Sequence, residues 1–338
     1  MARRGIQPIV TTITPLRISF LGGGTDLPSF YGTEGGAVVS TAINRYIYVT
    51  VKRHSHVFGE NYRLNYSISE HAQELDQIQN GIARECLRYI DATPPIYIST
   101  IADLPAASGL GSSSSFAVGL LNALHLFKGE EVSAGQLAEE AAHIELNVLK
   151  RAMGRQDHYA AAFGGLNHIS FLPGDRVTIE PLWMPNDGIE ALFRHSLLFW
   201  TNQQRDAGEI LIEQRDNNAD LADHLKEMRG QAHACRKALL AGFSPESFGQ
   251  LLHEGWQLKR QLSSRISNAS IDTWYELARK AGALGGKISG AGGGGFLYLV
   301  VPPERQDAVR AALHGMEEVS LGYEPRGTGI LSSRGLEI

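Results

Sequence analysis

The chain of 338 residues has little cysteine, no long apolar run and no excess of positive charge, and each shortage excludes a class of protein. Its two cysteines, Cys86 and Cys235, are far apart and lack Cys-x-x-Cys spacing, which is typical of reduced thiols. The most apolar late stretch, residues 295–301, is too short to span a bilayer, and residues 1–18 lack the apolar core of a secretory signal. A formal net charge of −5 disfavours nucleic acid or an anionic membrane as partner. We therefore expect a cytoplasmic protein that binds neither.

Length and composition predict a folded protein of two domains, because 43% of the residues are hydrophobic and 20% are charged. Strand patterns occupy residues 14–24, 35–53, 62–69, 94–105, 163–183 and 194–201. Helical patterns occupy residues 71–89, 112–127, 133–151, 209–262, 272–281 and 304–314. The two kinds of element mix without strict βαβ alternation, which predicts an α+β, two-lobed protein. We place an N-terminal domain at residues 1–190 and a C-terminal domain at 191–338.

Standard nucleotide-binding and hydrolase motifs are missing. Residues 282–289 approach a P-loop, but the glycine spacing is wrong and Ile288 follows the lysine. Residues 109–115 lack the third glycine of a dinucleotide fingerprint and the second glycine of a hydrolase elbow. His253-Glu254 has no second histidine at position 257, so a zinc helix is absent. The sequence therefore does not predict a serine hydrolase or a metal-only hydrolase.

Three glycine clusters are present instead, and they point to anion binding. In the central cluster, Gly109 and Gly111 precede four serines and a helical pattern, so residues 111–115 would form a helical first turn whose free N–H groups favour phosphate. Taken alone, this stretch is explained equally well by a linker or a helix cap. The clusters at residues 22–24 and 290–295 favour the anion site, because such glycines let backbone approach another backbone or a ligand.

Two acidic residues follow the central cluster. Glu145 lies in the predicted helix 133–151, which begins with a capping box at Ser133 and Gln136. The apolar stripe of this helix comprises Leu137, Ala141, Ile144 and Val148. Glu145 borders the stripe, and by spacing alone a solvated position at its flank is favoured. The second acid, Asp157, stands between Arg155 and His158, where a neighbouring arginine would favour the ionised carboxylate and a helix N-cap is the alternative.

These features together resemble the GHMP kinase superfamily, which comprises galactokinases, homoserine kinases, mevalonate kinases and phosphomevalonate kinases. Residues 14–26, 104–115 and 287–296 resemble its three motifs in order, with Ser114 and Ser115 where alanines are usual. Residues 17–26, 154–165 and 201–211 most resemble bacterial D-glycero-D-manno-heptose 7-phosphate kinases of nucleotide-activated heptose biosynthesis, to which L-fucose kinases are related. Galactokinases usually carry Gly-Glu-His-Thr-Asp where this chain has Gly-Gly-Gly-Thr-Asp, so galactose is disfavoured as the acceptor.

The resemblance implies an N-terminal lobe like ribosomal protein S5 domain 2 and a ferredoxin-like C-terminal lobe, with the active site between them. It implies ATP and Mg²⁺ as cofactors and phosphorylation of the anomeric (C1) hydroxyl of a sugar phosphate. Two alternatives stay open: a kinase acting on fucose or another sugar, and a non-catalytic sugar or nucleotide sensor. The resemblance also leaves a homodimer open.

The same resemblance implies residue roles. Asp157 would orient or deprotonate the sugar hydroxyl, and Arg17 would offset charge on the transferred phosphoryl group. Ser113 and Glu145 would hold the magnesium ion. The ATP-binding residues would be Pro105, Ser108, Gly109, Leu110, Gly111, Ser112, Ser113, Ser114, Gly290, Gly292 and Gly293. The acceptor-binding residues would be Gly23, Gly24, Thr25, Asp26, Arg155 and Arg205. The two arginines are candidates for the sugar phosphate, because a guanidinium binds phosphate through two hydrogen bonds, and pairing with Asp157 or Asp206 is the alternative.

Overall fold

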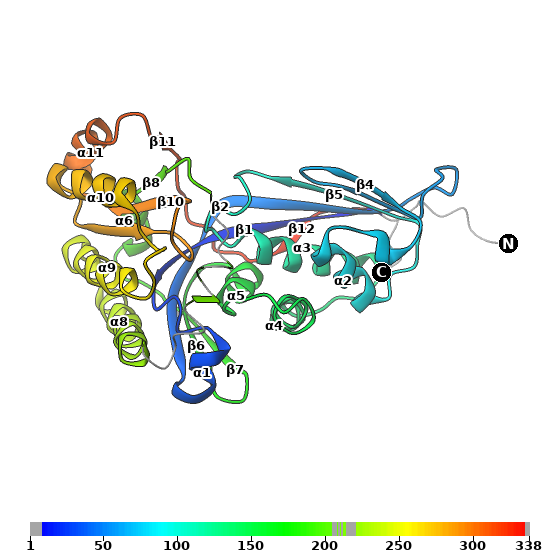
Figure 1. The fold of residues 1–338 in the computed structure, drawn as a ribbon, viewed down its shortest axis with the longest axis horizontal. Coiled ribbons are helices and arrows are strands. Elements are labelled where there is room, and N and C mark those ends of the chain that lie inside the picture. Colours follow the sequence, from blue (N-terminus) through cyan, green and yellow to red (C-terminus); the bar gives the residue numbers. More distant parts are fainter. Residues whose placement is uncertain (1–8, 205–207, 209, 211, 214–220, 335–338) are drawn as a thin grey trace.

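The computed structural model describes residues 9–204, 208, 210, 212–213 and 221–334, and these residues form two lobes (Figure 1). The first lobe is built on an eight-stranded sheet of order β12-β1-β2-β5-β3-β4, in which β6 pairs with β2 and β7 pairs with β6. Its strands are β1 (Ile9–Leu21), β2 (Gly36–Arg53), β3 (Tyr62–Asn65), β4 (Ser69–Ala72), β5 (Ile96–Ala102), β6 (Leu166–Leu172), β7 (Arg176–Pro181) and β12 (Gly329–Arg334). The α+β, two-lobed prediction is confirmed.

The second lobe contains a four-stranded antiparallel sheet of order β11-β8-β10-β9. Its strands are β8 (Ser196–Trp200), β9 (Gly285–Ile288), β10 (Phe296–Val300) and β11 (Glu317–Glu318). Every residue of β10 is buried, as expected for the apolar run at 295–301. Because β12 pairs with β1, the chain returns to the first sheet at its end. The domain boundary near residue 190 falls between β7 and β8 and stays a prediction.

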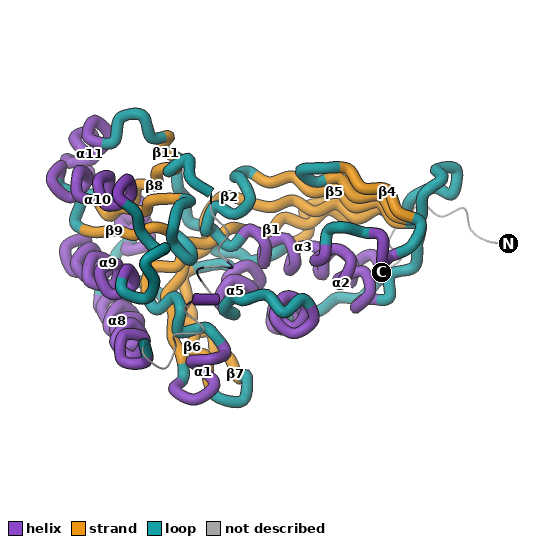
Figure 2. Tube along the Cα trace, viewed as in Figure 1, coloured by secondary structure: helices purple, strands orange, loops and turns teal. Residues whose placement is uncertain are grey.

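Helices pack on both sheets, and Figure 2 shows most of them below and to the left of the strands. The first lobe carries α1 (Pro28–Glu34), α2 (Gly81–Ile90), α3 (Ser112–Phe127), α4 (Ala134–Ala142) and α5 (Gln156–Phe163). The second half of the chain carries α6 (Gly188–Arg194), α8 (Ala222–Ala241), α9 (Pro245–Arg260), α10 (Ala269–Ala281) and α11 (Gln306–Ala312). Short 3-10 turns occupy Leu75–Gln77 and Pro303–Arg305. In the described part of the chain, no helix has the length and apolar character needed to cross a membrane.

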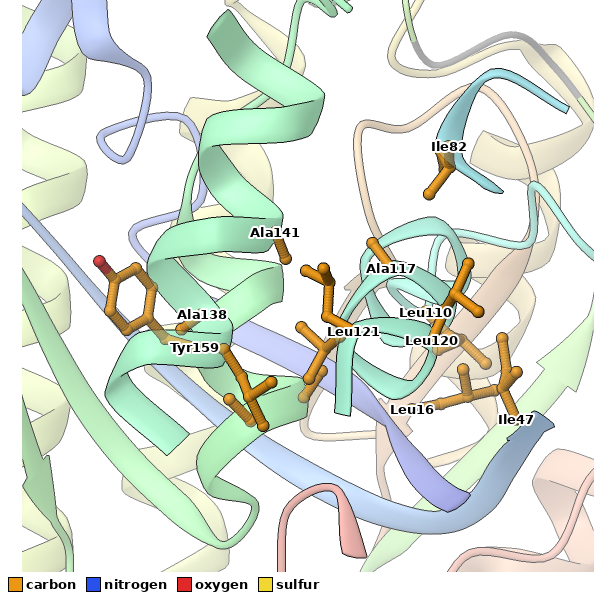
Figure 3. Close-up of a cluster of buried hydrophobic side chains, with 14 of the residues drawn as sticks. Leu16, Ile47, Ile82, Leu110, Ala117, Leu120, Leu121, Ala138, Ala141 and Tyr159 are labelled. Atoms are coloured by element: carbon orange, nitrogen blue, oxygen red, sulfur yellow. The ribbon is translucent and has the colours of Figure 1, made fainter. Parts of the chain in front are cut away.

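Helix α3 is the central helix of the first lobe. Its apolar residues are almost all buried, including Leu120, Leu121 and Leu124. Figure 3 shows Leu120 near Leu16 and Ile47 of the sheet, whereas Leu121 lies towards Ala141 of α4 on the other side of the helix. Since α3 is packed on several sides, its first turn at Ser112 is held rigidly relative to the sheet.

Three helix predictions were wrong in part. Residues 71–89 form the end of β4, a 3-10 turn and α2, which begins at Gly81 after the Asn80 cap. The pattern over 209–262 is divided by Gly242, where the backbone φ of +133° ends α8 before α9 begins. The helix expected over 133–151 keeps its Ser133 cap but changes after Ala142 into a wide π-helical turn, His143–Val148.

The glycine clusters bring backbone against backbone at the junction of the lobes. A Cβ on Gly109 would lie 2.4 Å from the carbonyl oxygen of Ser289, and one on Gly290 would lie 2.6 Å from the Cα of Gly109. A Cβ on Gly295 would lie 2.3 Å from the carbonyl oxygen of Ser108. Side chains at these positions would push the lobes apart, so the glycines are explained first by close contact between segments.

Candidate active site

A cavity of about 990 Å³ lies at the junction of the lobes, and most of the sequence-predicted site opens into it. The first lobe lines it through β1, the segment after β1, the start of α3 and the loop before α5; the second lobe contributes α9 and the loop after β9. Its wall includes the apolar side chains of Ile47, Leu104, Phe116 and Leu149. The wall also carries the charged side chains of Arg17, Asp26 and Asp157. This combination suits a ligand with a flat apolar part and a charged part.

The N-terminus of α3 opens into the cavity at Gly111, Ser112 and Ser113. Gly111 takes the N-cap position with φ +80°, and no side chain caps this end of the helix. By contrast, side-chain oxygens of Asn80, Ser133, Ser244 and Asn268 cap α2, α4, α9 and α10. The first N–H groups and the positive dipole end of a 16-residue helix therefore face the cavity, where they favour an anion.

Glu145 lies beneath this helix end, and the expectation of a solvated flank position was wrong. Its side chain is fully buried, whereas Val148, expected in the apolar stripe, is 44% exposed. Glu145 lies four residues after the buried Ala141, and Val148 ends a π-turn in which Leu149 N–H donates to the carbonyl of Ile144, five residues earlier. One extra residue in the turn rotates the following side chains by about 100°, as wide turns in helices at functional sites do. A strict 3.6-residue period cannot predict that rotation.

Both oxygens of Glu145 accept hydrogen bonds. Oε1 accepts from Ser113 Oγ at 2.5 Å and Arg151 Nη1 at 3.0 Å, and Oε2 accepts from Ser114 Oγ at 3.0 Å. His158 Nε2 lies 3.0 Å from Oε2. Burial alone would raise the pKa of Glu145, but the contacts with His158, Ser113 and Arg151 outweigh it and hold the pKa below its usual range. The carboxylate is therefore ionised beside a hydroxyl at the mouth of the cavity.

This pair fits a magnesium ion that is held jointly with phosphate oxygens. Mg²⁺ takes hard oxygen ligands and commonly binds one or two protein oxygens, with phosphates and waters completing its octahedron. Ser113 and Glu145 supply a hydroxyl and an ionised carboxylate within hydrogen-bond distance of each other. Over the residues that the structure describes, no cluster of three or more His, Cys, Asp or Glu side chains is arranged for a metal, so an all-protein site does not fit.

Arg17 and Asp157 form a direct ion pair in the wall of the cavity. Arg17 Nε and Nη2 donate to the two oxygens of Asp157, both at 2.7 Å, and Nη1 donates to the carbonyl of Gly109 at 2.6 Å. The alternative that Arg155 pairs with Asp157 is wrong, because Arg155 pairs with Glu139 and Asp175. Arg155 holds the N-cap position of α5, which places Asp157 in the first turn of that helix and not at its cap. The Arg17 bridge thus fixes the carboxylate next to the glycine loop before α3.

Asp26 is a further charged residue of the cavity wall. Its carboxylate accepts N–H bonds from Gly24 at 2.9 Å and Gln156 at 3.2 Å. Burial raises the pKa of Asp26, with a smaller contribution from Asp157, while these N–H bonds lower it. A Cβ on Gly154 would lie 1.9 Å from Oδ2 of Asp26, so the carboxylate packs directly on that glycine.

Some of the other predicted residues line the cavity, whereas the rest are buried behind its wall or lie away from it. Gly23, Gly24 and Gly290 line the cavity, whereas Leu110 and Thr25 are completely buried. Gly292 and Gly293 pack on Ile266, whose carbonyl accepts the Gly293 N–H at 2.8 Å. The remaining three do not line the cavity: Pro105 is exposed, Ser108 is buried, and Ser114 is buried on Glu145.

The two arginines considered for a sugar phosphate have different outcomes. Arg155 is buried, pairs with Glu139 and Asp175, and does not line the cavity. Its cation also lies over the ring of Tyr159. Arg205 lies outside the described residues. The structure therefore brings Arg17, Asp26, Ser113 and Asp157 to the cavity, whereas Glu145 is buried behind Ser113 and Arg155 does not line the cavity.

Two cations of the cavity were missed in the sequence. Arg151 bridges Ser113 and Glu145, and its position six residues after Glu145 was the only signal for it. Lys259 reaches the cavity from α9 and donates to the carbonyl of Gly290 at 2.6 Å. No motif marks Lys259, since it belongs to an ordinary amphipathic helix of the second lobe.

Comparison with known proteins agrees with this architecture. The model of the N-terminal domain of GHMP kinases matches residues 78–165, and that of their C-terminal domain matches residues 235–317. A D-glycero-alpha-D-manno-heptose 7-phosphate kinase from Campylobacter jejuni is 30% identical over 88% of this chain and 91% of its own length. An L-fucokinase/L-fucose-1-P guanylyltransferase from Bacteroides fragilis is 27% identical over 89% of this chain and 35% of its own length.

A solved structure adds to these relatives. It is a D-glycero-D-manno-heptose 1-phosphate kinase from Bacteroides thetaiotaomicron, which superposes with a TM-score of 0.78 and 26% identity over 96% of this chain and 99% of its own. Both family models flank the cavity, since one contains α3, Glu145 and Asp157 and the other contains Lys259 and Gly290. On these grounds the chain belongs to the GHMP kinase family.

Proposed function

We propose that this kinase transfers the γ-phosphoryl group of ATP to the anomeric hydroxyl of D-glycero-D-manno-heptose 7-phosphate. The observation that carries the proposal is the juxtaposition in one cavity of an uncapped helix N-terminus and the bidentate Arg17–Asp157 pair. The first suits the phosphates of a nucleotide, and the second suits a hydroxyl that must lose its proton. The similarity to the Campylobacter jejuni enzyme supports the choice of acceptor.

In this mechanism, the apolar side chains of the cavity wall hold the base of ATP and the first turn of α3 holds its phosphates. Ser113 and Glu145 would hold Mg²⁺, which neutralises phosphate charge when it is bound. Asp157 accepts the proton of the C1 hydroxyl through a lone pair that Arg17 does not use. The C1 oxygen forms its bond to the γ-phosphorus as the bond to the β-phosphate oxygen breaks, and ADP leaves. Arg17 offsets the negative charge on the moving phosphoryl group.

The names of the two heptose kinase relatives place phosphate at different carbons, position 7 in one and position 1 in the other. A coupled ADP-release assay should therefore compare the α- and β-anomers of heptose 7-phosphate, the 1-phosphate, free heptose and L-fucose. We expect turnover of one anomer of the 7-phosphate, with the new phosphate at C1 by NMR. Turnover of fucose without turnover of any heptose phosphate would refute the acceptor and favour the second candidate, an L-fucose kinase, to which the Bacteroides fragilis relative points.

The assignment of Asp157 has its own test. Asp157→Ala should lower kcat by about two to four orders of magnitude, the usual loss for a positioned acid or base, while ATP still binds. Asp223→Ala is the matched control, because that side chain is 98% exposed on α8. Unchanged phosphorylation by the Asp157 variant would contradict the catalytic role of Asp157.

A further inference from the structure

Three polar side chains converge on one point of the cavity wall, next to Gly23. The position that a Cβ of Gly23 would take lies 3.5 Å from Gln156 Nε2, 3.5 Å from Ser19 Oγ and 3.8 Å from Lys259 Nζ. The three side chains come from α5, β1 and α9, so both lobes contribute. All four residues line the cavity, and the missing side chain of Gly23 leaves room for one heavy atom at contact distance from the three polar atoms.

Two of these side chains have polar atoms without partners. Ser19 is 3% exposed and Gln156 is 8% exposed, yet Ser19 Oγ and Gln156 Oε1 have no hydrogen-bond partner among the described residues. Both segments are firmly held by other bonds: Ser19 accepts at its carbonyl from Lys287 Nζ at 2.7 Å, and the Gln156 N–H donates to Asp26. A buried polar atom without a partner costs free energy in the folded protein, so a ligand that satisfies both atoms is favoured.

From this convergence we infer that Ser19, Gln156 and Lys259 form a subsite, which we call the Gly23 niche, that binds a hydroxyl group of the acceptor beside the one that is phosphorylated. The inference rests on the proposed sugar kinase activity and names the groups that recognise the acceptor. None of these three side chains belongs to the glycine loops or to the pairs Ser113–Glu145 and Arg17–Asp157.

The donor and acceptor pattern favours a hydroxyl over a phosphate. A hydroxyl can accept from Lys259 Nζ or Gln156 Nε2 and donate to Ser19 Oγ at once, whereas a fully ionised phosphate has no proton to donate. The buried carboxylate of Asp26 acts on Lys259 and would repel a second anion here. The other charged groups that act electrostatically on Lys259 are Asp157 and Arg17, and Lys259 in turn acts on Lys287. Asp157 would therefore contact the sugar hydroxyl that is phosphorylated, and the niche would bind the hydroxyl next to it.

Lys259 remains a donor at neutral pH. Burial lowers its pKa to about 8, and the negative charges of Asp26 and Asp157 oppose a larger fall. One of its three N–H groups is bound to the carbonyl of Gly290, which leaves two for a ligand. Because Lys259 comes from the second lobe, an acceptor in the niche would contact both lobes.

The experiment combines two variants with a series of acceptors. Lys259→Met removes the ammonium group, and Gly23→Ala fills the niche with a methyl group that meets its neighbours at ordinary contact distances of 3.5 Å and more. Gly32→Ala is the matched control, since nothing lies within 4 Å of its Cβ position. Each protein is assayed for kcat and KM with the sugar that the acceptor panel identifies and with its analogues that each lack one hydroxyl.

We expect the unmodified protein to lose about 10- to 100-fold in kcat/KM with one deoxy analogue, as for a hydrogen bond to a charged donor. Lys259→Met and Gly23→Ala should lose a similar factor with the full acceptor and then no longer distinguish it from that one analogue. The KM for ATP and the melting temperature should stay near those of Gly32→Ala.

Two results would overturn the niche. One is that both variants still lose kcat/KM with the same deoxy analogue, relative to the full acceptor, as much as the unmodified protein does. That result would mean that the niche holds only water. The other is a loss of ATP affinity and melting temperature as large as the loss of acceptor kcat/KM, which would mean that Lys259 only holds the Gly290 loop. Because the series uses whichever sugar is turned over, failure of the heptose assignment is distinguishable from failure of the niche.

Discussion

Replacing Gly154 by alanine should disable the acceptor side of the site while leaving the nucleotide side intact. The new Cβ would lie 1.9 Å from Oδ2 and 2.3 Å from Cγ of Asp26. Ordinary van der Waals contact begins at 3.4 Å, so the carboxylate or the glycine must move by about 1.5 Å. Such a movement breaks the bonds from the N–H groups of Gly24 and Gln156 to Asp26. A misplacement of about 1 Å can cost roughly 100-fold in rate, and we expect a loss of that order in acceptor kcat/KM.

Steady-state kinetics with varied acceptor and with varied ATP provides the assay. The KM for ATP should change less than about threefold, because the start of α3 is fixed by its own packing and by the Arg17–Gly109 bond. Gly32→Ala is again the control, because its Cβ meets open space. In an Asp26→Ala background the clash is removed, so Gly154→Ala should have little further effect. Acceptor kcat/KM within threefold of the unmodified protein would refute the reasoning, as would additive losses in the double variant.

Two further predictions concern single side chains. Ser115 Oγ donates to the carbonyl of Pro15 at 2.8 Å and Ser114 Oγ donates to Glu145. Ser115→Ala should therefore lose about 1 kcal/mol of stability in thermal melts, whereas Ser114→Ala should raise the Mg²⁺ concentration that gives the half-maximal rate; identical behaviour of the two variants would contradict these assignments. Burial, with a smaller effect of His233, lowers the pKa of His168 to about 4 from 6.5, so its stabilising contribution is complete above pH 6.5 and disappears as the pH falls through 4. His168 also faces Glu180 and Arg236, and the melting temperature should fall less on acidification from pH 6.5 to 4 in His168→Asn; equal slopes would contradict this.

Local sequence patterns predicted much of the fold. The helix expected at 112–127 is α3 with the same bounds, and the short apolar run at 295–301 is the buried strand β10. Both elements follow from the spacing of apolar residues and from the glycines that flank them, and these signals lie within a few residues of each element. The glycine motifs likewise predicted that residues 109–115 and 290–295 would approach another segment, and they approach each other. The sequence also indicated the family through the order of its three motifs.

The tertiary structure decided which charged groups meet. Asp157 pairs with Arg17, 140 residues away, and not with the neighbouring Arg155, because α5 turns that arginine towards Glu139. Glu145 is buried against Ser113, Ser114 and His158, contacts with separate elements that no helical period reveals. Lys259 reaches the cavity only because the second lobe folds against the first. Sequence spacing determines the local element, but distances between separate elements are fixed by how their apolar faces pack, and the chemistry of this site depends on those distances.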